Sequence, residues 1–461
     1  MTPGATHDIR AQGALGDGRT VDTAAIQAAI DACAEAGGGT VVVPPGCYLT
    51  GSIVLRSRIE LRLSAGATLA GAVGSEHYPV IDSRYGGYVG FNAASEGGAF
   101  TQSGAGGDVA APAARGVSRA AHRPLIFADD EEDLVISGPG TIDGQGAPWW
   151  ALKRSGRLER ARPTLIGLNR CRRVTIRDVR LVDSPSWTVH PVLCTDVAIR
   201  GVRITNPPDA PNTDGIDPDS CSGVVISDCT VDVGDDCVCI KSGNEVDGRE
   251  VGTPCENVVI SNCIMRRGHG GVVVGSEISG GVEGLLVSNC VFDSTDRGIR
   301  IKSRRRRGGW ARDLSFSNIV MRDVWCPLVV NAFYHCGSDP ADAFIHGEAA
   351  QPVDETTPVF SDIRLAAITC RGATSAAGFV WGLPEMPVRR LSLRDVHVEV
   401  VQQPDRPARV AAMALAAEPT RGAGFLCRYA EDVRLDGVSI RGAVGEPWRF
   451  EECERVEGAS R

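Results

Sequence analysis

The chain of 461 residues has few aromatic side chains, no excess of positive charge and no long apolar run. Aromatics make up 5% of the residues and glycine accounts for 55 of them, so many tight turns around a core of small side chains are expected. The formal net charge of −9 argues against nucleic acid or an anionic membrane as a partner. An acidic ligand would therefore have to be held by local cations.

The sequence also lacks a recognisable disulfide framework, zinc motif or secretion signal. Its 16 cysteines are spread over the whole chain, and several lie in apolar strand-like runs, where a small buried thiol is expected. Paired cysteine motifs with zinc spacing are missing, so no metal or cofactor is expected. Residues 1–10 contain no basic region followed by an apolar stretch. We therefore expect a cytoplasmic protein with reduced thiols, or a secreted one if a leader precedes this sequence.

What the chain does contain is an internal repeat. Short apolar triplets followed by Ser, Asp, Asn or Gly and a second apolar strand begin at Val174, Val197, Val224, Val258, Leu285 and Leu314. Their starts are 23, 27, 34, 27 and 29 residues apart, which suits one coil of a β-solenoid with variable loops. Similar strands at 362–366, 390–394 and 432–436 extend the pattern. The sequence therefore predicts an all-β fold, a parallel β-helix that forms a single domain over residues 1–461.

Two segments depart from the repeat. Residues 22–36 predict a helix that caps the open end of the solenoid, with Asp22 as N-cap and Ile26, Ile30 and Cys33 on one apolar stripe. The first strand should follow at residues 40–43. Residues 83–123 are rich in Gly, Ala and Ser and predict a long loop insertion, which could either wall one end of a cleft or form a surface excursion.

The second half of each coil aligns as well, and it carries a column of polar residues. Ile216, Val238, Val272 and Ile299 fall in one inward-facing column. By the period of two, Asp217, Cys239, Val273 and Arg300 point outward, as do Asp219, Lys241, Gly275 and Lys302. Four successive coils carry the acidic or basic residues in register: Asp214, then Asp235 and Asp236, then His269, then Arg300 and Lys302.

This polar column is chemically costly for a structural protein. Carboxylates stacked about one rung (~4.8 Å) apart repel one another, so at least one should hold a proton towards neutral pH. A protonated acid beside an ionised carboxylate is the arrangement that cleaves glycosidic bonds, because one group protonates the leaving oxygen and the other activates water or attacks the sugar. Adjacent cations would then bind an acidic sugar.

These residues resemble a known family. The motifs Asn-Thr-Asp-Gly at 212–215, Gly-Asp-Asp at 234–236, Gly-His-Gly at 268–270 and Arg-Ile-Lys at 300–302 match, in order and spacing, the signature motifs of the polygalacturonases, glycoside hydrolase family 28. The segments at 16–20, 43–46 and 138–144 also look like this pectin-degrading superfamily of right-handed parallel β-helices. The resemblance covers about residues 10–340.

The resemblance implies an inverting hydrolase of α-1,4-linked galacturonic acid chains or oligomers. By position, Asp235 would be the general acid and Asp214 and Asp236 would activate water. His269 would tune Asp235, and Arg300 and Lys302 would hold the galacturonate carboxylate, with Asn212 as a further substrate contact. Inverting enzymes usually separate their two carboxylates by about 6.5–9.5 Å, and neighbouring rungs suggest a shorter distance. The expectation of inversion therefore comes from the family resemblance and not from this spacing. The expected partner is an acidic, galacturonate-containing oligosaccharide, and neither nucleic acid nor a membrane is expected.

Four further features each have two interpretations. Lys241 either contacts substrate or pairs with Asp219, and His190 either touches sugar or is structural. Tyr334 could contact sugar, although a core aromatic is the default. Residues 304–307 are four arginines, for which a solvated loop is a commoner outcome than a cationic rim.

Competing functions are open at this point. A rhamnogalacturonan hydrolase of the same family would share the motifs. A pectate lyase would share the solenoid but need calcium and a basic proton acceptor, whereas a non-catalytic carbohydrate-binding solenoid should lack the acid–base set. The insertion at 83–123 and the missing leader favour an exo-acting enzyme that finishes oligogalacturonides.

Overall fold

The computed structural model describes residues 5–84, 120–403 and 407–458, in two compact units, Met1–Asp235 and Asp236–Arg461. In the described residues, no helix has both the length and the apolar composition needed to cross a membrane. Residues 85–119 of the predicted loop insertion lie outside the described residues.

The first unit consists of parallel strands with short helices. Its elements are β1 (Ala5–Asp8), η1 (Ile9–Gln12), β2 (Asp17–Val21), α1 (Thr23–Glu35), β3 (Gly39–Val43), β4 (Gly46–Thr50), β5 (Ile53–Val54), β6 (Ile59–Leu63), β7 (Ala67–Gly71), η2 (Ser75–His77), β8 (Val80–Asp82), β9 (Ala120–His122), β10 (Ile126–Asp129), β11 (Glu132–Ser137), β12 (Thr141–Asp143), α2 (Ala147–Arg154), β13 (Ile166–Asn169), β14 (Arg172–Arg177), β15 (Arg180–Val182), β16 (Val189–Val192), β17 (Thr195–Arg200), β18 (Arg203–Thr205), β19 (Ser222–Ser227) and β20 (Thr230–Asp232).

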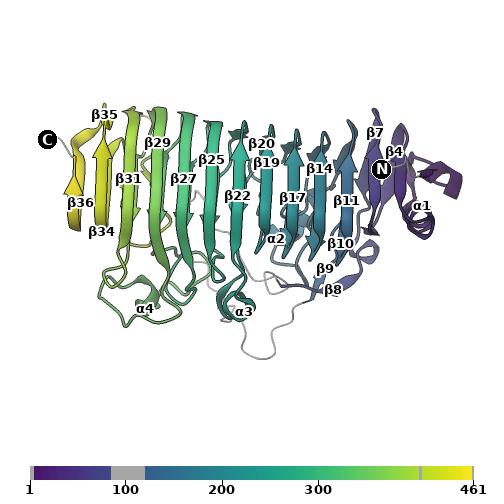
Figure 1. Ribbon diagram of the computed structural model, residues 1–461, viewed down its shortest axis with the longest axis horizontal. Helices are drawn as coiled ribbons and strands as arrows, with labels where there is room; N and C mark the ends of the chain where they lie inside the picture. The colour runs from purple at the N-terminus through teal and green to yellow at the C-terminus, as the bar shows by residue number, and fades with distance from the viewer. Residues whose placement is uncertain (1–4, 85–119, 404–406, 459–461) are drawn as a thin grey trace. The chain divides into compact units, whose positions relative to one another are not determined.

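Three stacks of parallel strands build this unit, as expected for a coiled solenoid. One stack contains β6, β11, β14, β17 and β19, which run side by side in Figure 1. The others contain β7, β12, β15, β18 and β20, and β5, β10, β13 and β16. The register places Val174 opposite Val197 and Val197 opposite Val224. The predicted spacing of the coils is therefore confirmed here.

The second unit continues the same kind of construction. Its elements are β21 (Val238–Ile240), α3 (Glu245–Val251), β22 (Cys255–Ser261), β23 (Ile264–Arg266), β24 (Val272–Gly275), β25 (Val282–Asp293), β26 (Arg297–Lys302), β27 (Trp310–Arg322), β28 (Cys326–Asn331), α4 (Ala343–His346), β29 (Val359–Ala373), β30 (Ala376–Trp381), β31 (Val388–Val400), β32 (Arg409–Val410), β33 (Pro419–Thr420), β34 (Ala423–Asp436), β35 (Ser439–Arg441) and β36 (Val444–Glu457).

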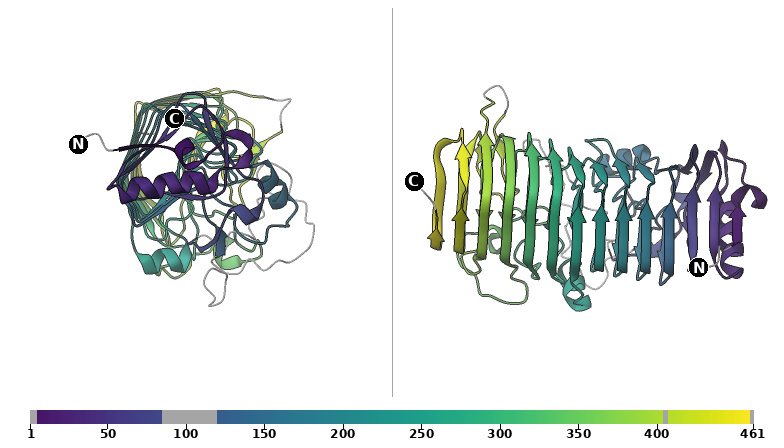
Figure 2. Two further views of the ribbon diagram at one scale, coloured as in Figure 1. Left: turned by 90° about the vertical axis from the view of Figure 1, so that its right-hand side faces the viewer. Right: turned by 45° about the horizontal axis from the view of Figure 1, so that its top comes forward.

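Apolar side chains stack in continuous columns inside this second unit. Strands β22, β25, β27, β29, β31, β34 and β36 pair in parallel, side by side in both Figure 1 and the right panel of Figure 2. One column along them contains the buried residues Val258, Leu285, Leu314, Ile363, Leu391 and Val433. The predicted C-terminal coils are confirmed, since their residues lie in β29, β31 and β34.

Residues in the left-handed conformation bend the chain where each coil turns. In the column where each coil turns, Asn262, Asn289 and Asn318 have φ between 52° and 57°. Asparagine adopts this conformation more easily than most residues, because its short side chain bonds locally. The Asn318 side chain also donates to that of Asn289 at 2.7 Å. This explains why Asn, Asp and Gly recur after the apolar triplets in the sequence.

The two ends are finished differently. Helix α1 lies across the end of the first coils (Figure 2, left panel) and buries Ile26, Ile30 and Cys33, which confirms the predicted cap. Asp22 is the N-cap residue, as predicted, but its side chain does not bond to the helix: the carboxylate instead accepts the backbone N–H groups of Leu15 at 2.9 Å and Gly16 at 3.0 Å. Those amides need an acceptor as much as the helix end does.

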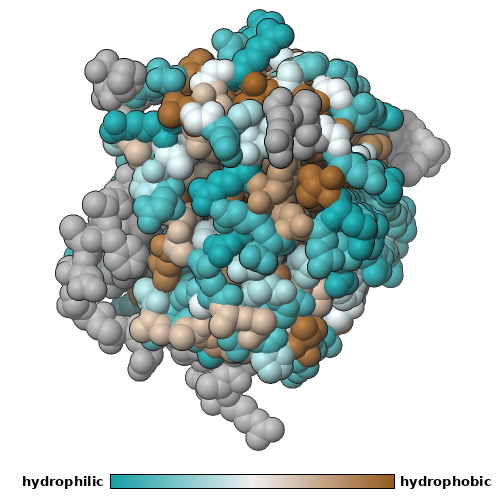
Figure 3. All heavy atoms as spheres, turned by 90° about the vertical axis from the view of Figure 1, so that its left-hand side faces the viewer, coloured by the Kyte–Doolittle hydropathy of each residue, from teal (hydrophilic) through white to brown (hydrophobic). Residues whose placement is uncertain are grey.

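The C-terminal end is protected by charge. Strand β36 carries Glu446, Arg449, Glu451, Glu452, Glu454, Arg455 and Glu457. Figure 3 looks onto this end, where hydrophilic side chains are interspersed with separate hydrophobic ones. Charged side chains on a final strand oppose pairing with another chain.

The predicted loop at 83–123 ends earlier than expected, because its last residues include a short strand. Residues 120–122 form β9, which pairs antiparallel with β8 through Ile81 and Ala121. The sequence gives little sign of this strand, because Ala-Ala-His has low β propensity and is ordered by its partner.

Candidate active site

The residue columns predicted for the second half of each coil are present in the second unit. Val238 pairs with Val272, which pairs with Ile299, and Cys239 lies in line with Val273 and Arg300. In the first unit, Ile216 bridges to Val189 and Asp219 to Val192, so the same coil segment is in register there. The outward-facing members are nevertheless buried, Arg300 being 2% exposed. Loops therefore cover this face of the strands.

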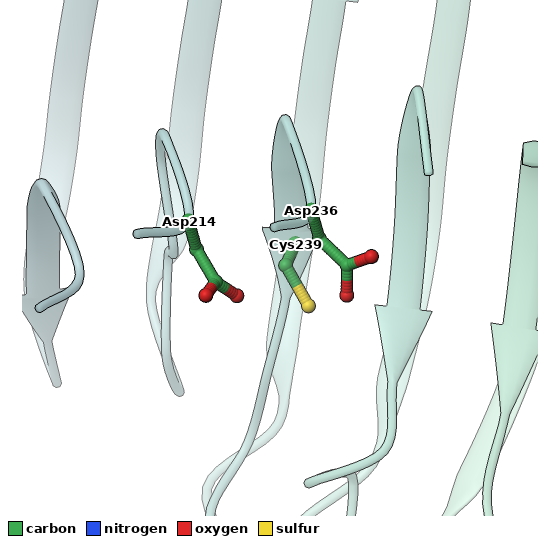
Figure 4. A group of neighbouring side chains, drawn as sticks. All are labelled: Asp214, Asp236 and Cys239. Carbon is green, nitrogen blue, oxygen red and sulfur yellow. The ribbon is translucent and has the colours of Figure 1, made fainter. Parts of the chain in front are cut away.

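The centre of the second unit's polar cluster is Asp236. Its two carboxylate oxygens accept separate charged donors: the Arg300 guanidinium at 3.1 Å and the Lys302 ammonium at 2.7 Å. All three side chains are almost completely buried, at 1%, 2% and 7% exposure. Figure 4 shows the Asp236 side chain next to Cys239 on the same coil, while Asp214 is carried by a coil of its own. Arg300 and Lys302 thus point to the same side of their strand, as their spacing predicted, and both contact Asp236.

This environment keeps Asp236 ionised. Burial by itself would raise the pKa of the Asp236 carboxyl, because a charge is costly in a low-dielectric interior. Lys302 and Arg300, with a smaller contribution from His269, outweigh burial and hold that pKa well below its usual range. Asp236 is therefore suited to act as a base or to orient water, and not as a proton donor.

His269 lies on the coil between the Asp236 and Arg300 coils. Its backbone carbonyl accepts from Arg297 at 3.3 Å, and the next carbonyl, of Gly270, accepts from Cys237 at 2.9 Å. A Cβ at position 270 would lie 3.4 Å from an Asp236 oxygen and 3.5 Å from the Arg300 Cβ, besides meeting Val273 at 2.3 Å. Glycine at this position therefore avoids a clash with the Val273 side chain, whereas the contacts with Asp236 and Arg300 would be ordinary ones. His269 itself is half-buried.

Tyr334 lies against the cations and not in the apolar core. Its ring centroid is 5.1 Å from the Lys302 ammonium, 5.8 Å from the Arg300 guanidinium and 6.0 Å from that of Arg307. A phenol ring in contact with three cations stabilises them through its π face. The ring is 5% exposed, as expected for a core aromatic, but its neighbours include cations.

The loop over this cluster was not predicted from the sequence. Asn331 donates to the Met413 carbonyl at 3.2 Å, and the Arg300 guanidinium contacts the Met413 sulfur at 2.8 Å. Arg297 holds the same loop through the carbonyls of Val410 and Ala411, both at 3.1 Å. No periodic pattern marks this segment, since its position depends on contacts with residues 82 to 114 positions earlier.

Lys241 and the arginine run form a second ionic network. Glu277 accepts from Lys241 at 3.3 Å and from Arg307 at 3.2 Å. Arg304 pairs with Glu245 at 2.6 Å and Arg305 with Glu385 at 2.6 Å, and all of these arginines are buried. The predicted solvated loop at 304–307 is therefore wrong, except for Arg306, which is half exposed. Arg304, Arg305 and Arg307 are buried because each neutralises a buried glutamate.

The first unit holds Asn212 and Asp214 in a densely bonded loop. Arg162 donates to the Asn212 side-chain oxygen at 2.7 Å. The Asp214 carbonyl accepts from the Thr188 N–H at 2.9 Å, and Asn206 donates to the Thr213 carbonyl at 3.1 Å. Asp214 is 3% exposed and Asp235, at the end of the same unit, is 8% exposed.

A cavity of about 400 Å³ lies in the first unit beside this loop. Its lining includes the predicted residues His190 and Asn212, together with Arg84, Arg162 and Trp187. His190 stacks edge-on against Trp187 at 4.7 Å between ring centroids and lies 3.6 Å from the Asp219 carboxylate. The same carboxylate accepts from Arg84 at 3.3 Å. His190 is thus both structurally held and part of a cavity wall.

A metal ion does not suit the residues around Asp236. Asp236 and Cys239 offer ligand atoms within 4.8 Å of each other. Both Asp236 oxygens are, however, engaged by cations, and a third cation there would be repelled by Arg300 and Lys302. The Cys239 thiol donates to the Gly275 carbonyl at 2.9 Å.

Two family models match separate parts of the chain. The family model described as Glycosyl hydrolases family 28 matches residues 110–369, and one described as Rhamnogalacturonase A/epimerase, pectate lyase-like matches residues 7–92. A probable polygalacturonase of Vitis vinifera is 32% identical over 84% of this chain and 73% of that protein. Several other curated relatives are matched over about half of their length or less.

Solved structures extend the similarity to the fold. An exopolygalacturonase from Thermotoga maritima is 26% identical, with a TM-score of 0.75 over 96% of this chain and 93% of that one. A family 28 exopolygalacturonase of Yersinia enterocolitica, at 21% identity and a TM-score of 0.76 over 100% of this chain and 79% of that one, shares the fold. The chain is thus a right-handed parallel β-helix and a glycoside hydrolase, and it belongs to glycoside hydrolase family 28.

Proposed function

We propose that this hydrolase cleaves α-1,4-linked galacturonic acid chains or oligomers. The observation that carries the proposal is the buried Asp236 carboxylate held between Arg300 and Lys302, directly after Asp235 in the chain. Membership of a hydrolase family sets the lyase and the non-catalytic solenoid aside.

The charges around Asp236 suit a uronate substrate. Two full positive charges, on Arg300 and Lys302, face one carboxylate, so these three side chains together carry one positive charge in excess. A sugar carboxylate would compensate that charge, whereas a neutral sugar would not. The planar guanidinium provides paired donors and the ammonium a compact charge.

The proposed proton transfer uses Asp236 in its ionised form. Asp236 stays ionised and so serves to orient and deprotonate water, in the proposed mechanism together with Asp214. Asp235 donates a proton to the leaving oxygen, and His269 tunes Asp235. Water attack on the face opposite the leaving group inverts the anomeric carbon.

We further propose that the enzyme acts from chain ends. Support comes from the cavity of about 400 Å³ in the first unit, whose volume falls in the range of sites that enclose small ligands. Arg84 and His190 provide cationic or polar groups, and Asp82 and Asp129 provide acceptors for sugar hydroxyls. The Trp187 ring adds an apolar wall of the kind that packs against a pyranose.

Exo action predicts slow viscosity loss. On polymeric pectate, release of reducing ends should run well ahead of the fall in viscosity, because each cut at a chain end removes only one small unit. Product sizing of digests of galacturonate oligomers should show one short product from the start. A rapid viscosity loss with few reducing ends would contradict exo action, and cleavage restricted to rhamnogalacturonan fragments would replace the proposed substrate.

We also propose that the enzyme works in a reducing compartment such as the cytoplasm. All 16 cysteines are present as thiols, and the sulfurs of Cys427 and Cys453 lie 3.8 Å apart, well beyond the roughly 2.05 Å of a disulfide. Thiol titration in denaturant, without reductant, should therefore find all 16 thiols per chain in freshly prepared native protein. A substantially lower number, with disulfides located by peptide mapping, would contradict this location.

A further inference from the structure

Arg162 connects two loops of the first unit. It is 8% exposed and lies between α2 and β13. One terminal nitrogen donates to the carbonyls of Pro185 at 2.8 Å and Pro211 at 2.7 Å. The other donates to the Asn212 side-chain oxygen at 2.7 Å. All three acceptors lie on the segments that precede His190 and Asp214.

These bonds require the shape of a guanidinium. Three acceptors from two separate loops are met by two nitrogens held in one plane, and each bond is charge-assisted. A lysine has one point of charge on a flexible stem and cannot reach all three in fixed directions. Since these donors are already committed to protein acceptors, Arg162 contributes more to the position of the loop than to sugar binding.

Arg162 keeps its charge although it is buried. Burial lowers the pKa of Arg162 to about 10, while the carboxylates of Asp214 and Asp235 favour its charged form. The guanidinium is therefore positively charged at neutral pH, and its bonds to the loop carbonyls are charge-assisted.

Neighbouring bonds hold the other side of the same segment. Asn206 donates to the Thr188 hydroxyl at 2.9 Å and to the Thr213 carbonyl at 3.1 Å. The Thr213 hydroxyl donates to the Ala210 carbonyl at 2.9 Å. The segment from Asn206 to Asp214 is thus fixed by neutral bonds on one side and by Arg162 on the other.

We propose that Arg162 is a positioning residue, which fixes the segment 211–214 and thereby the orientation of the Asp214 carboxylate during the reaction. It acts through Asn212 and the Pro185 and Pro211 carbonyls and does not contact the sugar. The consequence for the reaction rests on the function proposed above. The effect of Arg162 on the position of segment 211–214 does not depend on that function.

The first test uses no substrate. In Arg162→Gln, amide hydrogen exchange in peptides covering residues 206–216 should be faster than in the wild type, while the strands β14 and β17 keep their protection. The matched control Arg203→Gln removes an exposed arginine from the same unit and should leave this segment unchanged. Unchanged exchange at 206–216 in folded Arg162→Gln would overturn the proposal, whatever the activity.

The second test separates positioning from substrate binding. On a galacturonate oligomer, Arg162→Gln should lose about 10²-fold in kcat with little change in KM, the scale expected when a reacting group is misplaced by about 1 Å. Arg162→Lys should recover little, because it keeps the charge and loses the fork. Guanidinium added to Arg162→Ala should restore part of kcat, since Arg162 lines a cavity that small ions can enter.

Three results would count against positioning. If KM rises while kcat stays constant, Arg162 is a substrate contact. If Arg162→Lys is fully active, the charge of Arg162 matters and its planar shape does not. If Arg162→Gln keeps the wild-type kcat, Arg162 has no role in the reaction. Wild-type protein in the same assay tests the proposed function separately. If it hydrolyses no galacturonate oligomer, the function fails while the exchange experiment still decides the positioning role.

Discussion

Replacing Asp235 by asparagine is expected to lower kcat on galacturonate oligomers by about 10²–10⁴-fold, the contribution usual for a positioned general acid. Asparagine keeps the size and hydrogen-bonding reach of aspartate but cannot deliver a proton to the leaving oxygen. KM should change little, because the cations proposed to bind the uronate are untouched. Reducing-end release in the presence of EDTA measures the effect without interference from metal-dependent lyases.

The matched control for this variant is Asp178→Asn. Asp178 is an exposed aspartate of the same unit with φ of 64°, a conformation that asparagine also tolerates. Its activity should equal that of the wild type. If Asp235→Asn kept more than about a tenth of the wild-type kcat, far above the residual expected on loss of a general acid, Asp235 would not be the proton donor.

Replacing Lys302 by methionine should both inactivate and destabilise the enzyme. Methionine keeps much of the length of lysine but leaves the buried Asp236 oxygen without its 2.7 Å partner. Breaking a buried ion pair in this way costs about 3–5 kcal/mol, because the remaining charge stays desolvated. Activity should fall as well, since the proposed uronate site loses one of its two charges.

The stability effect should depend on pH with a definite sign. In the wild type, Lys302 and Arg300 overcome burial and keep the pKa of Asp236 below its unfolded value, so this carboxylate adds stability above about pH 4 and loses it as the pH falls. In the variant, burial is opposed mainly by Arg300, and the pKa of Asp236 rises. The two proteins should therefore differ most at neutral pH and less in acid, where the variant's carboxyl takes up a proton.

Urea denaturation at about pH 7 and about pH 4.5 checks this expectation. Arg394→Met, which removes an exposed cation from the second unit, is the control and should lie within about 0.5 kcal/mol of the wild type at both values. A loss of stability in Lys302→Met that is equally large at both pH values would show that lost packing, and not the unpaired carboxylate, is responsible.

The coils and the cationic pair were predictable because they are local and periodic. A strand turns every second side chain to the same face, so Val238, Val272 and Ile299 could be aligned by their spacing in the sequence, and Arg300 and Lys302 then had to share a face. The motifs around Asp214, Asp235 and His269 were recognisable by order and spacing alone.

Predictions about the surroundings of single side chains were less successful. The run at 304–307 looked like a solvated loop, yet Arg304, Arg305 and Arg307 are buried against Glu245, Glu385 and Glu277. Asp22 stands at the N-cap position of α1 but bonds to a different loop. In each case the partner is remote in sequence or lies outside the repeat, so composition and spacing contain no signal for it.

The solenoid, its capping helix, the family and the acidic and basic residues of the candidate site could all be inferred from the sequence. These follow from repeated apolar spacing, which selects one way of burying side chains, and from motifs within single coils. The folded chain adds that Asp236 is enclosed by its cations, that Met413 covers Arg300, and that Arg162 holds the Asn212 loop. The physical reason is that burial of a charge depends on where distant loops fold back, and hydrogen bonds between such loops follow no period.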